Sequence, residues 1–305
     1  MRISLYIPCY NGERYIARAI EGALRQSLPL DEVLVIDDGS RDRTREIALA
    51  YPVRVISHDR NRGLAAARNT GVRSARNELV ASLDADCVAE PTWLETLLPH
   101  LQDPTVGGAG GRLDETVLFS LADRWRQAHL AENWGPSFLV NPAFLFGANG
   151  LHRKPVLEAI GGYDEVTWVA GCGEDTDISR RIRQHGYKLI YDPAARVKHI
   201  KQDTTRSVLD TRWRWWRYGV GAYFQRIRLR SIAATFYRAH FRTMFFEHLA
   251  EDLRPGRFEL LWLDVLCLFY MPYRDLKLYW QSRFGPTRPP EEGSMARAAL
   301  EQSPR

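Results

Sequence analysis

Four short apolar runs near the N-terminus constrain the fold of this 305-residue chain more than any other feature. The runs are "ISLYIP", "EVLVI", "VRVIS" and "LVASL", and between them apolar residues recur at helical spacing, as in "RYIARAIEGALRQS". Strands this apolar and this regularly separated by helices form a parallel sheet that is covered on both faces. We therefore predict an α/β fold with a mostly parallel central sheet flanked by helices.

Each of the four predicted strands ends in a polar cluster. The clusters are "PCYNGE", "DDGS", "HDRNRG" and "DAD". In a sheet of this kind the carboxyl ends of the strands meet at one edge, and ligands bind there. The clusters therefore predict a binding site at that edge.

The pattern changes along the rest of the chain. After residues 1–106 a glycine-rich boundary, "GGAGGRLDE", opens a second half, residues 107–205, which contains the predicted helix "EDTDISRRIRQHG". Residues 206–285 have a helical, basic and aromatic pattern, and the Pro-, Gly- and charge-rich tail 286–305 is predicted to be disordered. We thus expect a first domain of residues 1–205, a helical aromatic-rich extension and a disordered tail.

Cysteine usage and hydropathy indicate the compartment. The four cysteines form no CxxC pair, which argues against a disulfide framework or a thiolate zinc site and favours a reducing compartment. The N-terminal apolar run is broken by Pro8 and is too short for a signal peptide. No window reaches the ~18 apolar residues needed to span a bilayer. The nearest approach, "LLWLDVLCLFYMPY", carries Asp264, and this apolar run stops at Pro272. We expect a cytoplasmic protein.

Asp84 and Asp86 follow the fourth apolar run directly, with only Ala85 between them. Two carboxylates one residue apart can hold a hard divalent cation, which keeps open positions for diphosphate oxygens. An acidic turn leaving the core has the same pattern, and Asp175-Thr176-Asp177 is a second match in this chain. The position at the end of a buried strand, beside three other polar strand ends, favours the metal site.

Two further strand ends carry candidate ligand contacts. Asp38 in "DDGS" can accept a hydrogen bond from a uracil N–H or a ribose hydroxyl, or it can simply cap the next helix. Arg62 and Gly63 in "NRG" precede an alanine-rich helix, where the arginine can approach a phosphate or be an ordinary loop residue. The residues alone leave these alternatives open.

Glu174 and Asp175 lie at the predicted start of a helix, in "GEDTDISRRI". Exposed N–H groups at a helix start favour carboxylates without any further function, but the preceding "GCG" would let a ligand approach closely. Arg180 and Arg181 follow and can orient a carboxylate or meet a phosphate. His199, at the end of the next strand, is a candidate third metal ligand, with a structural histidine as the alternative. This stretch supplies the best candidates for a general base.

The order of these motifs resembles family 2 glycosyltransferases, which have the GT-A nucleotide-diphospho-sugar fold. The motifs are "IPCYNGERYI", "VIDDGSRDRT", "NRGLAAARNTG", "LDADC", "GANGLHR", "GGYDE" and "GEDTDISRRIRQHG". They cover about residues 2–200, and their order is specific although no single piece is. The QxxRW motif of processive members is absent, because "QHGYK" and "RWRWW" do not fit it. A processive synthase with its own pore is therefore not expected.

The resemblance implies a role for each candidate residue. Asp175 would be the catalytic base, with Glu174 beside it, and Asp86 would bind the metal directly, with His199 completing that site. The residues implied to bind the nucleotide are Pro8, Tyr10, Glu13, Asp38, Arg62, Gly63, Asp84 and Ala85. The implied cofactor is Mn²⁺ or Mg²⁺.

The resemblance also implies a reaction, the inverting transfer of a sugar from a nucleotide-diphosphate donor to an acceptor hydroxyl. UDP-sugar is the favoured donor, and cell-surface glycan or glycolipid synthesis is the expected setting. The alternative is a non-catalytic nucleotide-sugar or nucleic-acid-binding protein that kept the fold, but the base and the metal-binding acids are both present. A nucleotidyltransferase would need a glycine-rich triphosphate loop, which "IPCYNGERY" does not supply.

Most of the positive charge lies in the C-terminal third. The chain has a net charge of +5, and Arg206 to Arg288 contains 15 Lys and Arg against 7 Asp and Glu. The stretch "RSVLDTRWRWWRYGVGAYFQRIRLRS" fits a packed helix with snorkelling arginines, an anionic membrane surface, or, least well, nucleic acid. The membrane interpretation predicts a peripheral protein at the inner face of the cell membrane. Its partners would be a nucleotide-sugar donor and a glycan or lipid-linked acceptor.

Overall fold

The computed structural model describes residues 2–166, 172–216, 248–253 and 257–284. The chain divides into two compact units: the first comprises Met1–Val117 and Ala131–Lys201, and the second comprises Leu118–Leu130 and Gln202–Arg305. The segment Leu118–Leu130 groups with the second unit, although the sequence pattern placed it in the first domain. The predicted disordered tail and most of the arginine- and tryptophan-rich stretch lie outside the described residues.

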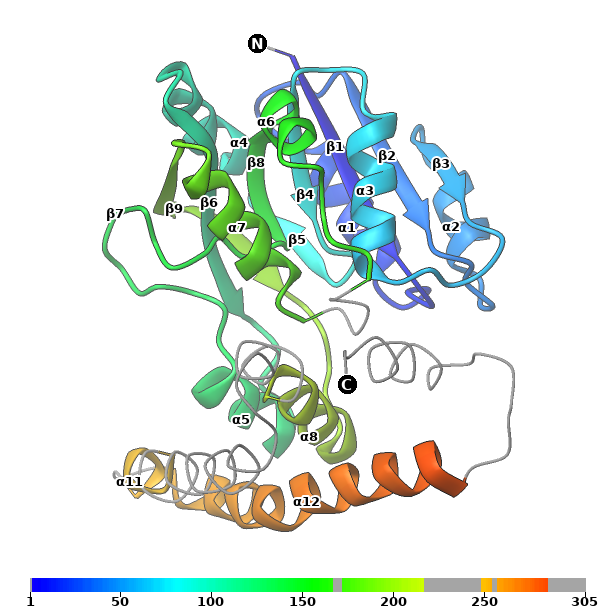
Figure 1. Cartoon of the computed structure of the whole chain (residues 1–305), viewed down its shortest axis with the longest axis vertical. Coiled ribbons are helices and arrows are strands. Elements are labelled where there is room, and N and C mark those ends of the chain that lie inside the picture. The colour runs from blue at the N-terminus through cyan, green and yellow to red at the C-terminus, as the bar shows by residue number, and fades with distance from the viewer. Residues whose placement is uncertain (1, 167–171, 217–247, 254–256, 285–305) are drawn as a thin grey trace, which may run out of the picture. The chain divides into compact units, whose positions relative to one another are not determined.

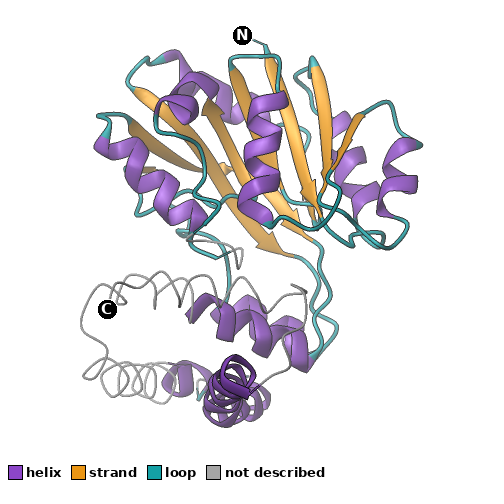
Figure 2. Cartoon of the chain, turned by 45° about the vertical axis from the view of Figure 1, so that its right-hand side comes forward, coloured by secondary structure: helices purple, strands orange, loops and turns teal. Residues whose placement is uncertain are grey.

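A nine-stranded sheet forms the first unit (Figures 1 and 2). One half of it runs in the order β3-β2-β1-β4 and is entirely parallel. Its strands are β1 (Ile3–Cys9), β2 (Glu32–Asp37), β3 (Arg54–Ser57) and β4 (Leu79–Leu83). These four strands coincide with the four apolar runs of the sequence, so the predicted parallel sheet is confirmed for this half.

Helices cover both faces of the parallel half (Figure 2). They are α1 (Ile16–Leu24), α2 (Thr44–Leu49) and α3 (Leu64–Ser74). Every residue of β1 is buried, with Leu5 and Ile7 in the core that contains α1, and Tyr6 in the opposite core, which contains α3. Because each fully buried side chain of this size stabilises the fold by roughly 1.5–3 kcal/mol, the two cores hold the strand ends, and hence the polar clusters, in fixed positions.

The other half of the sheet is mixed, which the sequence did not predict. The strands are β5 (Cys87–Ala89), β6 (Val106–Glu115), β7 (Leu139–Val140), β8 (Asn149–Arg153) and β9 (Lys188–His199). β8 pairs antiparallel with β4 and β6, and β9 runs parallel to β6 but antiparallel to β5 and β7. The accompanying helices are α4 (Trp93–Leu97), the 3₁₀ helix η1 (Leu98–Gln102), α6 (Lys154–Ala159) and α7 (Glu174–Gln184).

The glycine-rich stretch expected to be a domain boundary is strand β6. Its glycines serve close packing rather than flexibility. A Cβ atom on Gly111 would collide with the backbone carbonyl of Ala195 in the neighbouring strand. A glycine inside a strand commonly marks such a close backbone approach. The stretch is thus a packed strand within the sheet, and the division of the first domain into residues 1–106 and 107–205 stays a prediction.

The second unit is helical in its described part. Its elements are α5 (Leu121–His129), α8 (Thr205–Arg214), α11 (Leu249–Asp252), the 3₁₀ helix η4 (Phe258–Leu260) and α12 (Leu261–Phe284). A capping box closes the start of α5, because the Ser120 hydroxyl accepts from the Asp123 N–H and the Asp123 carboxylate accepts from the Ser120 N–H. Trp125, Val208 and Leu263 are among the residues that form its core.

The apolar run that stops at Pro272 lies within helix α12, which continues through this proline as far as Phe284. An interior proline costs a helix ~3 kcal/mol because it removes one backbone hydrogen bond. Packing offsets this cost, since Leu263, Cys267 and Met271 on one face of α12 are buried. Among the described helices, none is both long enough and apolar enough to cross a membrane.

Candidate functional site

The loops after β1 and β2 are tied together by side chains. The Asn11 N–H donates to the Ser40 hydroxyl at 2.9 Å, and the Arg41 N–H donates back to the Asn11 side-chain carbonyl at 2.9 Å. The Gly12 N–H donates to the buried Thr44 hydroxyl at 2.8 Å. Two of the four predicted polar clusters therefore form one connected surface at the carboxyl edge of the sheet.

Asp38 organises the third cluster. Its carboxylate is buried and accepts from the backbone N–H groups of Arg62 and Gly63, both at 2.8 Å, and it pairs with His58 Nδ1 at 2.6 Å. Gly63 has a φ of 94°, a conformation that favours glycine, and leads directly into α3. A carboxylate offers about four acceptor positions, so Asp38 retains capacity for one more donor. His58, which the pattern analysis did not single out, fixes the orientation of this carboxylate.

Other predicted nucleotide contacts line the same edge. Tyr10 has a ring that is 42% exposed, while Pro8 is buried within β1. The Glu13 carboxylate accepts from the Arg43 N–H at 3.1 Å, so it helps to hold the loop after β2. The Arg62 side chain is partly exposed and lies 3.7 Å from Glu165. These residues are positioned at the edge where the sequence predicted a ligand.

A buried arginine that the sequence did not indicate connects the two halves of the candidate site. Arg68, on the alanine-rich helix α3, is 2% exposed. Its guanidinium donates to Asp84 at 3.1 Å and to the Ser82 hydroxyl at 2.8 Å, and its Nε lies 3.8 Å from the Glu174 carboxylate. Arg68 also donates to the carbonyl of Gly147. The Arg68 guanidinium thus contacts both the aspartate pair after β4 and the acidic start of α7. These two segments are 90 residues apart in the chain.

The charges around Arg68 stabilise one another. Burial alone would lower the pKa of Arg68, but Asp84, then Tyr163 and Glu174, raise that pKa well above its ordinary value. Burial raises the pKa of Asp84, and Arg68 opposes that rise. Arg68 is buried while Asp84 is partly exposed, so losing the carboxylate would leave an unpaired guanidinium charge inside the protein, which is strongly destabilising.

Strand pairing brings Asp86 and His199 together. β5 and β9 pair so that Cys87 lies opposite His199, and the Ile200 N–H donates to the Asp86 carbonyl at 2.9 Å. His199 Nε2 consequently lies 3.4 Å from an Asp86 carboxylate oxygen. The two residues proposed from the sequence as metal ligands are therefore neighbours in the fold.

Glu115 fixes the orientation of the His199 ring. The parallel register of β6 and β9 places Glu115 opposite His199, and the Glu115 carboxylate bonds His199 Nδ1 at 2.8 Å. Burial would lower the pKa of His199, but Asp86, followed by Glu115, raises it to about 10. Metal-binding histidines commonly hold a carboxylate on one ring nitrogen so that the other faces the metal. Glu115 supplies that second contact, and no local pattern in the sequence indicates it.

These residues fit a divalent cation. Asp86 offers carboxylate oxygens on a side chain that is 30% exposed, and His199 directs Nε2 to the same point. Carboxylate together with one imidazole suits Mn²⁺ well, and Mg²⁺ also accepts carboxylate and water ligands. The cation would replace the proton that His199 shares with Asp86, which removes the need for a charged imidazole at this position.

Glu174 and Asp175 begin helix α7 immediately after Gly173, which has a left-handed conformation. Glu174 is 4% exposed, and burial, then Asp175, raise its pKa to about 8. Asp175 is half-buried and accepts from the Thr176 N–H at 2.7 Å, and burial raises its pKa while Arg68 lowers it. Glu174 is buried against Arg68, whereas Asp175 is only half-buried, so Asp175 is the more accessible proton acceptor of the two.

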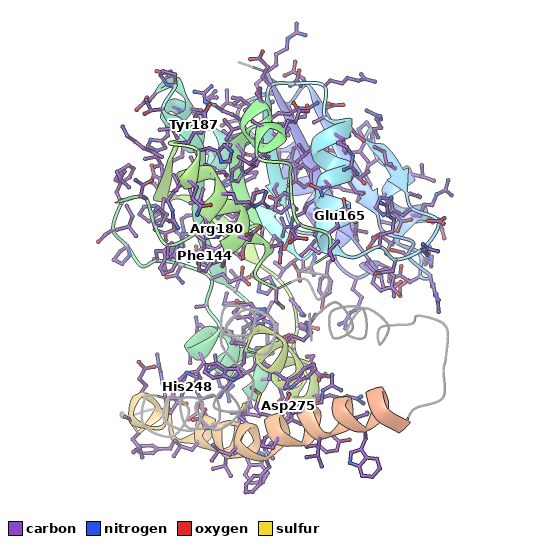
Figure 3. All side chains as sticks on the ribbon, viewed as in Figure 1. Phe144, Glu165, Arg180, Tyr187, His248 and Asp275 are labelled. Atoms are coloured by element: carbon purple, nitrogen blue, oxygen red, sulfur yellow. The ribbon has the colours of Figure 1, made fainter. Side chains whose placement is uncertain are left out.

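The second acidic match on α7 has a structural role. Asp177 binds Arg180 at 2.7 Å and Arg181 at 2.8 Å. Arg181 also donates to the Ile160 carbonyl at 2.8 Å. The sequence suggested that both arginines orient a catalytic carboxylate or meet a phosphate. Arg181 instead ties α7 to the residue after α6, and Arg180, labelled in Figure 3, bonds Asp177 and Gln184 on α7 itself.

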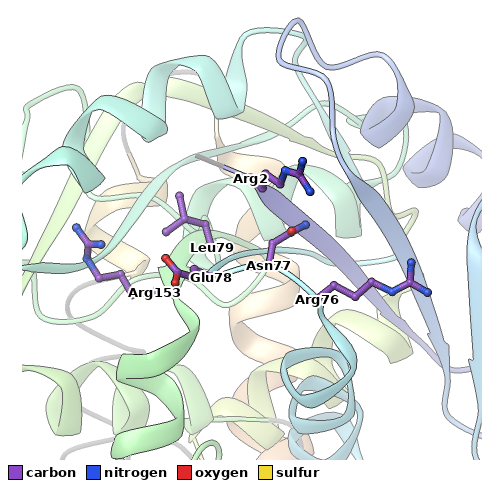
Figure 4. A pocket seen from close by; sticks show the side chains of 6 residues that line it. All are labelled: Arg2, Arg76, Asn77, Glu78, Leu79 and Arg153. Carbon is purple, nitrogen blue, oxygen red and sulfur yellow. The ribbon is translucent and has the colours of Figure 1, made fainter.

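A separate pocket of about 300 Å³ lies at the opposite ends of the strands (Figure 4). It is lined by Arg2, Arg76, Asn77, Glu78, Leu79 and Arg153. Its arginines are occupied: Arg153 donates to the Val106 carbonyl at 2.9 Å, and Arg76 lies 3.8 Å from Glu32. This pocket precedes β1 and β4, so it is distinct from the carboxyl-edge site.

Solved structures define the fold class. The mannosyltransferase PcManGT from Pyrobaculum calidifontis, in complex with GDP-Man and Mn²⁺, matches with a TM-score of 0.56 and 20% identity over 98% of this chain and 79% of that one. S. aureus TarS 1-349, in complex with UDP-GlcNAc, matches with a TM-score of 0.55 and 14% identity, covering 90% of this chain and 92% of that one. The chain therefore has a GT-A fold.

The family follows from the sequence comparison. The family model "Glycosyl transferase family 2" matches residues 4–156, about half of the chain. The chain belongs to glycosyl transferase family 2, as its motif order suggested.

Named relatives match about two-thirds of the chain. The pre-mycofactocin glycosyltransferase of Mycobacterium tuberculosis is 29% identical over 212 residues, 65% of this chain and 42% of the relative. The succinoglycan biosynthesis protein ExoO of Rhizobium meliloti is 34% identical over 225 residues, 68% of this chain and 63% of the relative. The glucosyl-dolichyl phosphate glucuronosyltransferase of Haloferax volcanii is 27% identical over 217 residues, 65% of this chain and 69% of the relative. The chain thus spans about two-fifths to two-thirds of the length of these relatives.

Proposed function

We propose that this chain is a metal-dependent, inverting and non-processive glycosyltransferase that moves a sugar from a nucleotide-diphosphate donor to an acceptor hydroxyl. The observation that carries the proposal is the connected set of Asp86, His199 and Glu115 on one side and Glu174 and Asp175 on the other. Arg68 joins them by contacting both Asp84 and Glu174. A candidate cation site and a candidate base at one sheet edge are the two parts that sugar transfer needs.

Each residue has a defined part in this mechanism. Asp86 and His199 would hold the cation, and Glu115 would keep the His199 ring in position. When bound, the cation would neutralise the charge that grows on the departing nucleoside diphosphate. Asp175 would accept the proton of the acceptor hydroxyl, and its raised pKa makes it a stronger base than an ordinary aspartate. Attack from the face opposite the leaving group inverts the anomeric carbon.

The nucleotide would bind along the loops after β1, β2 and β4. Tyr10 offers an exposed ring on which a base can stack, and the remaining acceptor capacity of Asp38 suits a ring N–H or a ribose hydroxyl. Arg62, Gly63, Asp84 and Ala85 line the path toward the cation site. UDP-sugar is our favoured donor. The neighbours crystallised with GDP-Man or UDP-GlcNAc support a nucleotide-sugar ligand in general.

A thermal-shift screen should identify the donor. With Mn²⁺ present, we expect one nucleotide sugar of the UDP series to raise the melting temperature by several degrees, because a ligand at 100 times its Kd stabilises the folded state by about 2.7 kcal/mol. The GDP- and dTDP-sugars serve as controls, and each donor is repeated with EDTA. If no nucleotide sugar stabilises the protein at millimolar concentration, the proposed substrate class is wrong.

The rival function is a binding protein that kept the fold but lost catalysis. It predicts donor stabilisation without release of nucleoside diphosphate on any time scale. Retention of both Asp86 and Asp175 in a connected site favours the enzyme. Nucleic-acid binding is favoured by no described feature of the first unit, where many of the arginines on the described surface, such as Arg43 and Arg196, pair with carboxylates.

We further propose that the protein works at an anionic membrane surface on a lipid-linked or glycan acceptor, from the cytoplasmic side. The supporting feature is a stripe of exposed apolar side chains on α12, called the α12 stripe. It consists of Trp262, Val265, Phe269, Tyr273, Leu276 and Trp280. These residues follow one another at steps of three or four, so they share one face of the helix. Trp262 is 61% exposed and Phe269 is 72% exposed.

The chemistry of the α12 stripe fits a membrane interface. It carries no charge, and both acidic residues of α12 are engaged elsewhere, since Asp264 accepts from Trp125 and Asp275 from Trp213. Tryptophan and tyrosine favour the level of the lipid headgroups, and the surrounding C-terminal third has the basic excess that attracts anionic lipid. The name of the Haloferax volcanii relative, a glucosyl-dolichyl phosphate glucuronosyltransferase, is consistent with a lipid-linked acceptor.

The described part of the arginine- and tryptophan-rich stretch has a different role. In α8, Val208, Leu209 and Trp213 are buried, and Arg274 lies 4.5 Å from the centroid of the Trp213 ring. This part follows the packed-helix interpretation of the sequence, while residues 217–231 lie outside the described ranges. The α12 stripe lies within residues 206–285, the region for which the sequence suggested contact with an anionic membrane surface.

A flotation assay tests the α12 stripe. We expect the full chain to float with vesicles containing phosphatidylglycerol, and the double variant Trp262→Ser/Trp280→Ser to partition at least about tenfold more weakly, because each lost tryptophan removes roughly 1.5–3 kcal/mol of buried apolar surface. Phe119→Ser is the matched control, since Phe119 is an exposed aromatic residue outside α12. Equal flotation of all three proteins would contradict the proposal, as would a wild-type dimer that dissociates in the double variant without lipid.

A further inference from the structure

The described part of the second unit contains a buried cluster of histidine and aspartate side chains that the proposed reaction does not use. Its members are His129, the last residue of α5, His248 immediately before α11, Asp252 at the end of α11, and Asp264 in α12. Figure 3 labels His248 among the side chains near α5 and α11. The two histidines are 119 positions apart in the chain, so folding, rather than local sequence, brings them together.

The cluster has the ligand spacing of a metal site. His129, His248 and Asp264 each offer one ligand atom, and these atoms lie within 4.8 Å of one another. In a tetrahedral zinc site the ligand atoms are roughly 3.3 Å apart, because each lies about 2.0 Å from the metal. The rings of His129 and His248 are stacked, with centroids 4.2 Å apart, so closing the cluster on an ion requires a ring rotation as well as a contraction of about 1–1.5 Å.

Two of the ligands are held through one atom while the other atom has no partner. His129 bonds Asp252 through Nε2 at 2.8 Å, and within the described residues its Nδ1 has no hydrogen-bond partner. Asp264 accepts from Trp125 Nε1 at 2.9 Å through one oxygen, and its Oδ2 likewise has no partner among the described residues. This is the arrangement in which a second contact orients a ligand and leaves its other atom directed at the metal.

Burial makes these atoms costly without a ligand. The side chains of His129 and Asp252 are fully buried, and Asp264 is 3% exposed. A buried polar atom without a hydrogen bond costs about 1–3 kcal/mol, and the cluster contains several. A neutral imidazole is the form that binds metal, and burial lowers the pKa of His129. The competing account is a purely polar network in which Asp264 and Asp252 share a proton, because burial raises the pKa of Asp264 to about 7. That network still leaves Nδ1 of His129 without a hydrogen-bond partner among the described residues.

We propose that His129, His248 and Asp264 bind a Zn²⁺ ion whose fourth position is taken by water, with Asp252 orienting His129. Two imidazoles and one carboxylate match zinc better than magnesium or calcium, which prefer all-oxygen sites. The ion would join the end of α5, the start of α11 and the buried face of α12. It differs in ligands and in location from the cation site at Asp86 and His199, and it stands whether or not the proposed reaction is correct.

The test is metal content in the absence of nucleotide. The full-length protein is equilibrated with Zn²⁺, dialysed against metal-free buffer, and measured by plasma mass spectrometry. We expect about one equivalent of zinc in the wild type and in Asp86→Ala. His248→Gln should bind at least about 100-fold more weakly, and Asp252→Asn about 10- to 100-fold more weakly, because second contacts carry effects of that size. His185→Gln, which alters an exposed histidine just after α7, is the matched control.

Cobalt substitution gives an independent readout. Co²⁺ in a tetrahedral site with two histidines absorbs visible light far more strongly than Co²⁺ in water, and we expect that absorption in the wild type, the Asp86→Ala variant and the His185→Gln control. His248→Gln should lose it. Should His129→Gln fail to fold, His248→Gln still decides the matter, because His248 is only half-buried. Sub-stoichiometric zinc in the wild type, or equal zinc binding in wild type and His248→Gln, overturns the proposal.

Discussion

Replacing Asp175 by asparagine is expected to reduce sugar transfer by about 10²- to 10⁴-fold, the usual contribution of a positioned general base. The carboxamide keeps the size of the side chain and can still accept the Thr176 N–H, which Asp175 now accepts at 2.7 Å. It cannot take a proton from an acceptor hydroxyl. Donor binding should persist, because no described contact of Asp175 involves the residues around the cation site other than the shared Arg68. The measurement is release of nucleoside diphosphate, with acceptor or with water as the nucleophile.

Asp177→Asn is the matched control for this prediction. It makes the same substitution one position beyond Thr176 on α7, where the carboxylate forms ion pairs with Arg180 and Arg181. We expect its transfer rate to stay within a few-fold of the wild type. Glu174→Gln provides a third arm, since Glu174 is buried against Arg68 and its loss should disturb positioning rather than proton transfer. Near wild-type turnover in Asp175→Asn would remove Asp175 from its assigned role.

The parallel half of the sheet was predictable because its information is local. Each of the four strands is a short apolar run, and each polar cluster follows its strand directly. A parallel sheet then places the carboxyl ends of its strands at one edge, whatever the sequence of the connecting segments. Asp84, Asp86 and Asp38 could therefore be placed at one edge from the amino-acid pattern alone.

The mixed half was not predictable in the same way. Strands β6 and β8 carry glycines where neighbouring strands approach closely, and glycine in a sequence signals a turn more often than a packed strand. Helix α12 likewise continues through Pro272, because tertiary packing offsets the hydrogen bond that the proline removes. In each case the deciding contact, such as Gly111 against Ala195, is made with a distant part of the chain.

The residues that complete the site were missed because their partners are remote in sequence. Arg68 looks like one polar residue on an alanine-rich helix, and only the fold shows that it contacts Asp84 and Glu174. Glu115 meets His199 through a strand register that spans 84 residues. The position of Arg68 among small residues was the one available indication in the sequence. It suggests a buried ion pair but does not indicate which carboxylate is the partner.

Replacing Asp86 by alanine is expected to abolish Mn²⁺-dependent nucleotide binding. The Asp86 carboxylate lies 3.4 Å from His199 Nε2, and its loss would leave the imidazole as the main remaining ligand. We expect calorimetry to show an at least about 100-fold weaker affinity for the nucleoside diphosphate in the presence of Mn²⁺, since even second contacts to a metal ligand are worth 10- to 100-fold. Without Mn²⁺, wild type and variant should bind the nucleotide equally weakly. The metal contribution is thereby separated from the contacts made by the strand-end loops.

The chain offers a matched control for this change. Asp192 pairs with His100 at 2.8 Å in the same unit, so Asp192→Ala also removes a carboxylate from a histidine, but at a place without the Glu115 contact or the neighbouring Asp84. Its Mn²⁺-dependent binding should match the wild type. His199→Gln should weaken that binding as Asp86→Ala does, because both would supply ligands to the same ion. Unchanged affinity in Asp86→Ala would mean that the cation binds elsewhere. A loss of the same size in Asp192→Ala would mean that the effect comes from disturbed folding. A loss confined to Asp86 and His199 locates the metal at the junction of β5 and β9, where Asp86 and His199 are adjacent because their strands pair.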